Sequence, residues 1–436
     1  MDILKFVLKE GAEDVVLERV KGIMKQVRFA NNSITISQTW DLFFYKLFLT
    51  WKNRVMNTVI YDVSDNSVKK TVRNLIKISK LIQPNQNYFG IAEGPFRYKR
   101  VLNIYDKKIE NIDETDIIRS AINSALQNSK KTAGVFYTNS FQREIETSSN
   151  ISASEKSSSI QISIRAFNEK DESGHAVFCS RVLKKFDPES AGKKAGEISK
   201  LAKNPKKYKI GKFDIIFDPL SIANLLSLID KFSSSFAIDS GVSFLKDKIG
   251  KKVGSRIVDL IDDGRIENGF NSSIFDEEGV PTKRTNIINK GVLNTYLHNT
   301  STAKKYKTKT TGNAGLIAPQ PTNTILKPGK ISKEDLFNEV KNGLYITNVW
   351  YTRFQNYLTG DFSTIPRDGI FLIKNGEIVK SLKGIRISDN LQRILLNIAD
   401  TSNKPEWIYW WGLEGSVPVF TPYVLVKNVK ITLPTM

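Results

Sequence analysis

Histidine and cysteine are the scarcest chemically versatile residues of this sequence. The chain of 436 residues has two histidines, His175 and His298, and one cysteine, Cys179. A single cysteine cannot form a disulfide within the chain, which excludes a disulfide-stapled scaffold. A zinc site built from several His and Cys ligands would need nearly all three residues, and a Ser-His-Asp or Cys-His catalytic site has only two candidate bases.

Signatures of several other protein classes are also missing. No run of about 18 apolar residues occurs, as a membrane-spanning helix would need. Charges interrupt Met1–Gly11, so the sequence starts without the apolar segment of a signal peptide. The chain has no G-x-G-x-x-G, no G-x-x-x-x-G-K-[ST] and no H-E-x-x-H motif. The lack of a membrane span and of a signal peptide, together with the lone thiol, predicts a cytoplasmic protein.

The charge is strongly positive but unevenly distributed. The chain has 65 basic and 45 acidic residues, a formal net charge of +20. Between Arg181 and Lys212 eleven basic side chains stand against three acidic ones, a local excess of eight. Such a segment contacts nucleic acid or an acidic partner, or it forms a solvated helix face. No zinc finger, helix-turn-helix or single-strand-binding motif accompanies it, which favours the solvated face.

The first 205 residues show one pattern twice: a helix, about five short strands and a second helix. In the first copy we expect turns at Lys21-Gly22 and Asp41 to separate the strands. The local sequence also repeats: FANNSITIS at 29–37 and ETSSNISAS at 146–154 both read as a turn that leads into a strand of small polar residues. These features predict an N-terminal domain over residues 1–205 that is a structural duplication, with halves at about 1–82 and 112–204.

Residues 206–436 have the pattern of a β-rich domain with few helices. Asp218-Pro219 predicts a helix start, and Ser332 with Asp335 predicts another. Asn375-Gly376 between two apolar runs predicts a β-hairpin, and Val424–Leu433 a closing strand. The fold class is therefore α+β, with a duplicated helix–antiparallel sheet–helix unit followed by a β-rich mixed C-terminal domain.

Few residues offer chemistry of their own. His298 lies in TYLHNTSTAKK among hydroxyl side chains, which favours a structural or substrate-backbone contact over general base catalysis. His175 and Cys179 lie about 13 Å apart if they share one strand, too far to bind the same metal ion. A group of acids lacks EF-hand spacing and is expected to be solvated in loops: Asp262, Asp263, Glu267, Asp276, Glu277 and Glu278.

Eight short sequence motifs in a fixed order, here called the family motifs, resemble those of the TldD/PmbA family, often labelled modulator of DNA gyrase or U62-type peptidase. They are DDGRIENGF, FDEEGVPTKRTNIINKGVL, YLHNTSTAKK, TTGNAG, TNTILKPGKIS, GLYIT, TGDFS and LIKNGEI, all between Asp262 and Ile378. The resemblance covers Gly211 to about Asp400 and extends weakly to Gly11–Glu18. It implies a duplicated α+β N-terminal domain, a β-rich C-terminal domain and a dimer.

The metal motif of the family is missing here. Family members that cut peptides resemble zinc proteases with H-E-x-x-x-H on one helix and a cysteine ligand near the C-terminus. In the matching helix, LLSLIDKF at 225–232, the resemblance places Ser227 and Phe232 at the histidine positions and Leu228 at the glutamate position. The C-terminal stretch Trp407–Ser416 has no cysteine. These side chains cannot bind zinc or activate its water.

Three hypotheses follow. The favoured one is a non-catalytic subunit of a TldD/PmbA-type metallopeptidase complex, with no metal or cofactor of its own. It would shape a peptide cleft, with His298, Thr311 and Asn313 as candidate peptide contacts, and would form a homodimer or pair with a zinc-bearing TldD-type subunit. The second is a peptidase with a diverged site around His298 and the acidic loops. The third is a nucleic-acid-associated gyrase modulator, which rests on the charge and the family label.

Two aromatic clusters remain open in function. One includes Trp350, Tyr351, Phe354 and Tyr357, and the other includes Trp407, Tyr409, Trp410 and Trp411. If exposed they suit a protein interface, where Trp and Tyr are enriched. Otherwise they pack in the core of the β-rich domain.

Overall fold

The N-terminal region is built from two matching sets of helices and strands. The structure is a computed structural model that describes residues 1–433. The first set consists of α1 (Ile3–Lys9), β1 (Val15–Ala30), β2 (Ser33–Trp51), β3 (Arg54–Ile60) and α2 (Asp65–Ser79). The second set consists of α3 (Glu114–Leu126), β4 (Lys131–Thr147), β5 (Ser152–Phe167), β6 (Ser173–Ser180) and α4 (Pro188–Leu201). Two short 3-10 helices, η1 (Lys107–Asn111) and η2 (Leu183–Lys185), lie beside the second set.

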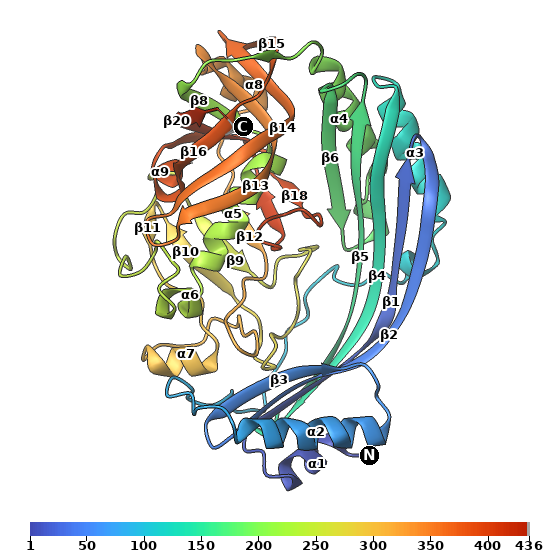
Figure 1. Cartoon of the computed structure of the whole chain (residues 1–436), viewed down its shortest axis with the longest axis vertical. Coiled ribbons are helices and arrows are strands. Elements are labelled where there is room, and N and C mark those ends of the chain that lie inside the picture. The colour runs from blue at the N-terminus through green and yellow to red at the C-terminus, as the bar shows by residue number, and fades with distance from the viewer. Residues whose placement is uncertain (434–436) are drawn as a thin grey trace.

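All six strands form one antiparallel sheet in the order β3-β2-β1-β4-β5-β6. The two sets meet where β1 pairs with β4, so each half of the sheet mirrors the strand order of the other. Helices α1 and α2 cover one end of the long curved sheet, and α3 and α4 cover the other (Figure 1). The predicted duplicated helix–antiparallel sheet–helix fold is confirmed, although each unit has three long strands rather than about five short ones.

The two predicted turns in the first unit do not exist. Residues Lys21 and Gly22 lie in the middle of β1, and Asp41 lies in the middle of β2. Gly22 pairs with Phe141 of β4, and a Cβ atom on it would come within 2.2 Å of the Ser140 carbonyl oxygen. The glycine therefore permits a close approach of two strands instead of a chain reversal. Its local sequence does not distinguish the two uses.

The C-terminal region contains two further sheets. One sheet has the order β11-β10-β9-β12-β19-β18 and the other β13-β8-β20-β16-β14-β15-β7, with β17 paired to β20. Its first strands are β7 (Lys206–Lys207), β8 (Gly211–Phe217), β9 (Leu260–Asp263), β10 (Arg284–Asn289), β11 (Val292–Leu293) and β12 (Thr324–Leu326). Its later strands are β13 (Asn342–Asn356), β14 (Asp361–Lys374), β15 (Glu377–Lys383), β16 (Arg386–Asn390), β17 (Ile398–Thr401), β18 (Glu406–Ile408), β19 (Val419–Thr421) and β20 (Val424–Thr432).

One helix, α5 (Pro219–Phe232), packs between the two C-terminal sheets. It contacts β8 and β13 of one sheet and β12, β18 and β19 of the other. Nearly every residue of α5 is buried, because both of its faces are covered. The other helices are short: α6 (Ser235–Asp239), α7 (Thr300–Lys305), α8 (Lys333–Asn338) and α9 (Leu391–Leu396). No helix within residues 1–433 combines the length and apolarity needed to cross a bilayer.

The local start and turn signals of this region are confirmed. The Asp218 carboxylate accepts a hydrogen bond from the Leu220 amide at 3.0 Å and caps α5. Ser332 and Asp335 form a reciprocal capping box at α8. Asn375 and Gly376 turn the chain between β14 and β15 with φ angles of 49° and 83°, the left-handed region that such tight hairpins require.

The two regions face each other across a long contact (Figure 1). Strand β6 contacts β13, β14 and β18, and helix α4 contacts β14. The chain passes from one region to the other between α4 and β8, near the predicted boundary at residue 205. That boundary and the limits of the repeat halves stay predictions.

Candidate functional site

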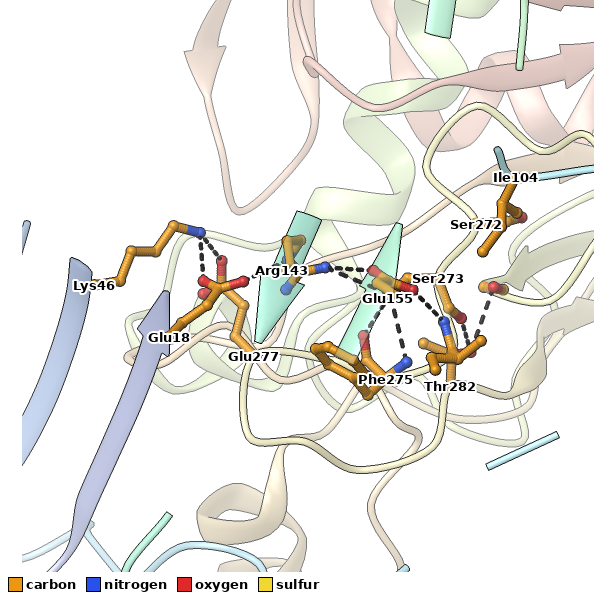
Figure 2. Close-up of polar contacts among 12 residues, drawn as sticks. Glu18, Lys46, Ile104, Arg143, Glu155, Ser272, Ser273, Phe275, Glu277 and Thr282 are labelled. Carbon is orange, nitrogen blue, oxygen red and sulfur yellow. Dashed lines mark hydrogen bonds and ion pairs between the residues drawn. The ribbon is translucent and has the colours of Figure 1, made fainter. Parts of the chain in front are cut away.

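A polar cleft of about 420 Å³ lies between the N-terminal sheet and the loops of the C-terminal region. Strands β4 and β5 supply one wall, from Asn139 to Arg143 and from Glu155 to Ser159. The opposite wall consists of residues from the loops at 270–277 and 313–322, which overlap the family motifs, together with Tyr409. Figure 2 shows how side chains of the sheet reach toward these loops. The cleft is the candidate functional site.

A network of charged side chains, some of them buried, connects the sheet to the loops at this cleft (Figure 2). Arg143 of β4 forms ion pairs with Glu18 of β1 and, at 3.0 Å, with Glu155 of β5. Lys46 of β2 pairs with Glu18 at 3.0 Å and with Glu277 of the opposite loop at 3.2 Å. Burial raises the pKa of Glu18, but Arg143 and Lys46 outweigh it, and the net pKa is lowered. The Glu18 carboxylate therefore stays charged although its side chain is only 3% exposed.

Glu155 also holds the loop directly. Its carboxylate accepts hydrogen bonds from the Ser273 hydroxyl at 2.6 Å and from the Ile274 amide at 2.9 Å. The guanidinium of Arg143 lies over the Phe275 ring, 5.1 Å from its centroid. Because one carboxylate and one guanidinium contact both walls, the network determines the width of the cleft.

Arg181 is buried beside the same cleft without an ion-pair partner within residues 1–433. It is 4% exposed, and its guanidinium donates to five backbone carbonyls. These are Ile104 at 2.8 Å, Phe270 at 2.6 Å, Gly269 and Ser272 at 3.3 Å each, and Ser158. Burial lowers the pKa of Arg181 to about 10, so the side chain remains charged at neutral pH. Arg181 thus joins the connector before η1, strand β5 and the loop at 269–272.

The acidic loop residues are mostly buried, which corrects the expectation that they are solvated. Asp262 is fully buried, Asp263, Asp276 and Glu278 are nearly so, and Glu277 and Glu267 remain accessible. The Asp262 carboxylate accepts hydrogen bonds from the Thr322 and Asn323 amides, and Asp276 accepts three from backbone amides. Backbone amides of the family motifs satisfy these carboxylates, so the acids stabilise the loops that contain them. Spacing in the sequence could not reveal those partners.

This burial predicts a stability that falls as the pH rises. Burial, reinforced by the neighbouring Asp276 carboxylate, raises the pKa of Glu278 to about 8. The folded state therefore binds more protons than the unfolded state between the ordinary pKa of glutamate and pH 8, and stability declines with pH across that window. From pH 6.5 to 8.5 we expect Glu278 to account for a loss of about 2 kcal/mol in the free energy of unfolding. His175 and His298, whose pKa falls to about 4 in the folded state, oppose this loss in part near pH 6.5, where the unfolded chain still protonates them.

Urea unfolding at the two pH values measures this loss. The variant Glu278→Gln should remove most of the decline, because a neutral amide does not titrate. Glu334→Gln changes an exposed glutamate on α8 and should leave the decline unchanged. Stability that is constant or increases over this range in the unsubstituted protein would contradict the prediction.

The three candidate peptide contacts are close together in the fold, but only one lines the cleft. The His298 amide donates to the Thr311 hydroxyl at 2.8 Å, and the Thr311 amide donates to the His298 carbonyl at 3.1 Å. The His298 ring is buried against Tyr306 and contacts Thr302, and burial lowers its pKa to about 4. Asn313 lines the cleft and donates to the Gln320 carbonyl at 3.1 Å. Their role in peptide binding stays a prediction.

The positions that the family resemblance assigns to metal ligands hold core side chains. The Ser227 hydroxyl donates to the Asn224 carbonyl at 3.1 Å and accepts from the Gly415 amide at 3.1 Å. Phe232 packs edge-on against Phe244 and Phe354. A Cβ atom on Gly415 would come within 2.4 Å of the Ser227 hydroxyl oxygen. This arrangement does not fit a zinc ion, since it offers no imidazole, thiolate or carboxylate.

Leu228, at the position of the family glutamate, is partly buried and packs against the same hydrophobic core. Within residues 1–433 no group of three or more His, Cys, Asp or Glu side chains has a geometry that could hold a metal ion.

Sequence patterns did not reveal Glu18, Arg143, Glu155 and Arg181 as parts of the site. A faint signal exists for the first three, since charged residues in the interior of strands predict either an edge or a buried ion pair. Arg181 belongs to the basic segment that the sequence predicts to be a solvated helix face, but its side chain is only 4% exposed. Its five partners are carbonyls from three distant segments, which no local pattern encodes.

Known proteins resemble this chain in sequence and in fold. Residues 210–433 match the family described as PmbA/TldA metallopeptidase C-terminal domain. A metalloprotease of Methanocaldococcus jannaschii is 36% identical over 221 residues, which cover 48% of this chain and 48% of that protein. TldE from Thermococcus kodakarensis has a TM-score of 0.86 at 20% identity and covers 99% of both chains. A structure from Thermotoga maritima, titled a modulator of a DNA gyrase, has a TM-score of 0.85 at 22% identity and covers 99% of this chain and 98% of its own.

The matched family is one of metallopeptidase-related proteins, and the match spans more than half of this chain. The chain belongs to the PmbA/TldD family, as its sequence motifs predicted. The alignments to the first curated relatives span only about half the length of those proteins, 48% and 57%. The structural likenesses, at 20% and 22% identity, extend over the whole chain and show the shared fold.

Proposed function

We propose that this chain is a non-catalytic subunit of a TldD/PmbA-type metallopeptidase complex that acts in peptide proteolysis or maturation. In this proposal the chain shapes the peptide cleft, while a TldD-type partner subunit binds zinc and cleaves the peptide. The chain itself holds no metal or cofactor. The complex is a dimer with that partner or with a second copy, and it works in the cytoplasm, where the buried reduced thiol of Cys179 is stable.

The contact between Ser227 and Gly415 is the observation that carries the proposal. In the family resemblance, helix 225–232 and the stretch Trp407–Ser416 are the two segments that supply metal ligands. Here these segments do pack against each other, and the Gly415 amide hydrogen-bonds to the Ser227 hydroxyl. A serine, a leucine and a phenylalanine fill the helix positions, and a glycine faces them. The scaffold of a metal site is retained while its ligands are replaced by packing contacts.

The cleft supports the second half of the proposal. It is open to solvent, and its walls offer hydroxyl, amide and charged groups from both regions, including Ser157, Ser159 and Asn313. Such groups can hydrogen-bond the backbone of an extended peptide. The net charge of +20 would increase the affinity for acidic peptides.

The proposal predicts that the purified chain alone binds no stoichiometric zinc and cleaves no peptide. Zinc content by elemental analysis and hydrolysis of a casein-derived peptide pool measure both. Co-purification from the native organism should bring down a family member that contains H-E-x-x-x-H, and a chelator should abolish the activity of that complex. Robust chelator-sensitive cleavage by the isolated chain would overturn the proposal.

The two alternatives have less support. A diverged peptidase would need His298 as its base, but that ring is 2% exposed and its pKa lies far below 7, which makes it a weak base. A nucleic-acid modulator would rest on the net charge and on a relative's title. Both can be tested on the purified chain: the first by its peptide cleavage, and the second by its binding to duplex DNA.

A further inference from the structure

A second cavity, of about 530 Å³, lies between the two regions and shares no lining residue with the polar cleft. Strands β4, β5 and β6 supply one wall, including Tyr137, Ser163 and Arg165, with Arg28 of β1 beside them. The other wall consists of three tryptophans, Trp350, Trp410 and Trp411. The volume falls within the usual range of ligand sites.

The tryptophans form one aromatic cluster. Their ring centroids lie 5.1 Å apart for Trp350 and Trp410, 5.4 Å for Trp410 and Trp411, and 5.9 Å for Trp350 and Trp411, all edge to face. Trp410 is 3% exposed and anchors the cluster, whereas Trp411 is 64% exposed. An indole exposed to that extent beside a cavity offers apolar surface to a ligand.

The charges at this cavity are all positive. Arg165 lies over the rings of Trp350 and Phe167, at 5.5 Å and 5.4 Å from their centroids. Arg28 is exposed and donates only to the Gln26 side chain, at 2.8 Å, among residues 1–433. No Asp or Glu lines the cavity. Arg165 is paired with Asp368 behind the wall, so it is the charge of Arg28, which has no ion-pair partner among residues 1–433, that favours an anion in the cavity.

A buried hydrogen-bond network holds Arg165 in place. Arg165 pairs with Asp368, which also accepts from the Asn348 amide at 3.3 Å. Asn348 donates to the His175 ring at 2.9 Å, and the other ring nitrogen of His175 lies 2.9 Å from the Ser163 hydroxyl. The guanidinium is thus fixed before any ligand enters, which lowers the entropy cost of binding.

Three nitrogen atoms in the cavity walls are buried without an acceptor among residues 1–433. They are Nε of Arg165 and the indole Nε1 atoms of Trp350 and Trp410. Buried donors are normally paired, and leaving one unpaired costs about 1–3 kcal/mol. All three lie beneath the surface of the cavity, so they do not themselves identify a group of the ligand.

Both cavities lie along the same strand. The polar cleft contacts β4 at Asn139, Phe141 and Arg143, and the second cavity contacts it at Ala133, Val135 and Tyr137. The adjacent residues Tyr409 and Trp410 line one cavity each. Alternate residues of a strand share a face, so one extended chain running along β4 can occupy both cavities. This continuity favours a peptide over an isolated small anion.

We infer that the second cavity binds the C-terminal end of a peptide, with its carboxylate toward Arg28 and Arg165 and an aromatic or apolar last side chain against the tryptophans. Upstream residues of the peptide then lie in the polar cleft. This inference rests on the proposed function, because it assigns the end of the substrate to a part of the same groove.

Binding of a defined peptide to the full chain tests the inference. The probe is an N-acetylated peptide of six alanines followed by phenylalanine, titrated by calorimetry and by tryptophan fluorescence. The free acid should bind about tenfold more tightly than the C-terminal amide, since the amide lacks the charge that the arginines recognise. Equal binding of acid and amide, no binding of either, or tighter binding of a single-stranded oligonucleotide would overturn the inference.

Two substitutions of exposed side chains and one control test whether the binding is local to this cavity. Arg28→Gln and Trp411→Ala change exposed side chains, so the fold should survive, and each should weaken the free acid about tenfold. Arg28→Gln should also bring acid and amide to similar affinities. Arg73→Gln is the control, because Arg73 is likewise an exposed arginine but lies at a remote surface, where it pairs with Glu10. A loss in the control as large as in Arg28→Gln would contradict a local effect.

The outcomes separate the two proposals. Binding needs neither zinc nor a partner, so a failure of binding leaves the subunit role to be judged by co-purification. Conversely, chelator-sensitive cleavage by the isolated chain would overturn the subunit role and leave the peptide-end site intact.

Discussion

Arg143→Met should lower the free energy of unfolding by about 3–5 kcal/mol. Arg143 is the shared partner of Glu18 and Glu155, whose side chains are 3% and 4% exposed. Methionine retains much of the packing volume over Phe275 but leaves two carboxylates buried with less compensation. Lys46 still pairs with Glu18, so the larger part of the loss should arise at Glu155. Chemical denaturation at pH 7 measures it.

The pH dependence identifies the cause of the loss. The lowered pKa of Glu18 contributes stability that is present above the ordinary glutamate pKa and disappears as the pH falls through the folded-state value. Removing Arg143 withdraws that contribution, so the difference between variant and parent should be largest near pH 7 and smaller near pH 4, where the Glu18 carboxylate can be protonated.

Two further variants serve as controls. The double variant Arg143→Met with Glu155→Gln should recover part of the stability, because a neutral amide costs less to bury than an unpaired carboxylate. Arg119→Met removes an exposed partner of Asp116 and should cost less than about 1 kcal/mol. An Arg143→Met loss as small as that of Arg119→Met would show that the network does not stabilise the fold.

Arg181→Leu should destabilise the protein by about 3–4 kcal/mol, since it leaves up to five buried carbonyls without their donor. The loss should be concentrated at the interface of the two regions, because Arg181 joins Ile104 and Ser158 on one side to Gly269–Ser272 on the other. Hydrogen exchange should therefore increase first in the loop at 269–272. The amides of α1 and α2, at the far end of the sheet, should retain their protection.

The lysine variant separates charge from geometry. Arg181→Lys retains the positive charge but has three donors on one nitrogen, which cannot reach carbonyls spread around a planar guanidinium. It should recover only a part of the loss. Arg100→Leu changes an exposed arginine of the same connector and should change the stability by less than about 0.5 kcal/mol. Full stability of Arg181→Lys would mean that charge alone matters at this site.

The contrast between Asp218 and Gly22 shows how far local sequence extends. Asp218-Pro219, Ser332 with Asp335, and Asn375-Gly376 act through partners within four residues, so their caps and turn could be predicted and were found. Gly22 looks like a turn residue in the local sequence, but a glycine is needed there because Phe141 on another strand lies too close for a side chain. The acids at 262–278 posed the same problem, because the amides that bind them come from 313–323 and from their own turns.

Three properties belong to the amino-acid sequence itself: the scarcity of histidine and cysteine, the order of the family motifs, and the residues at the metal positions. They determined the family, the α+β class and the absence of a zinc motif without reference to any structure. Only the tertiary structure decided which strands run unbroken, that Arg181 and most of the acidic loop are buried, and that two cavities lie end to end along β4. Each of these depends on pairing between residues that are distant in the chain, from 23 positions for Arg181 with Ser158 to 125 for Arg143 with Glu18, and such pairing arises only when the whole sheet and both regions pack together.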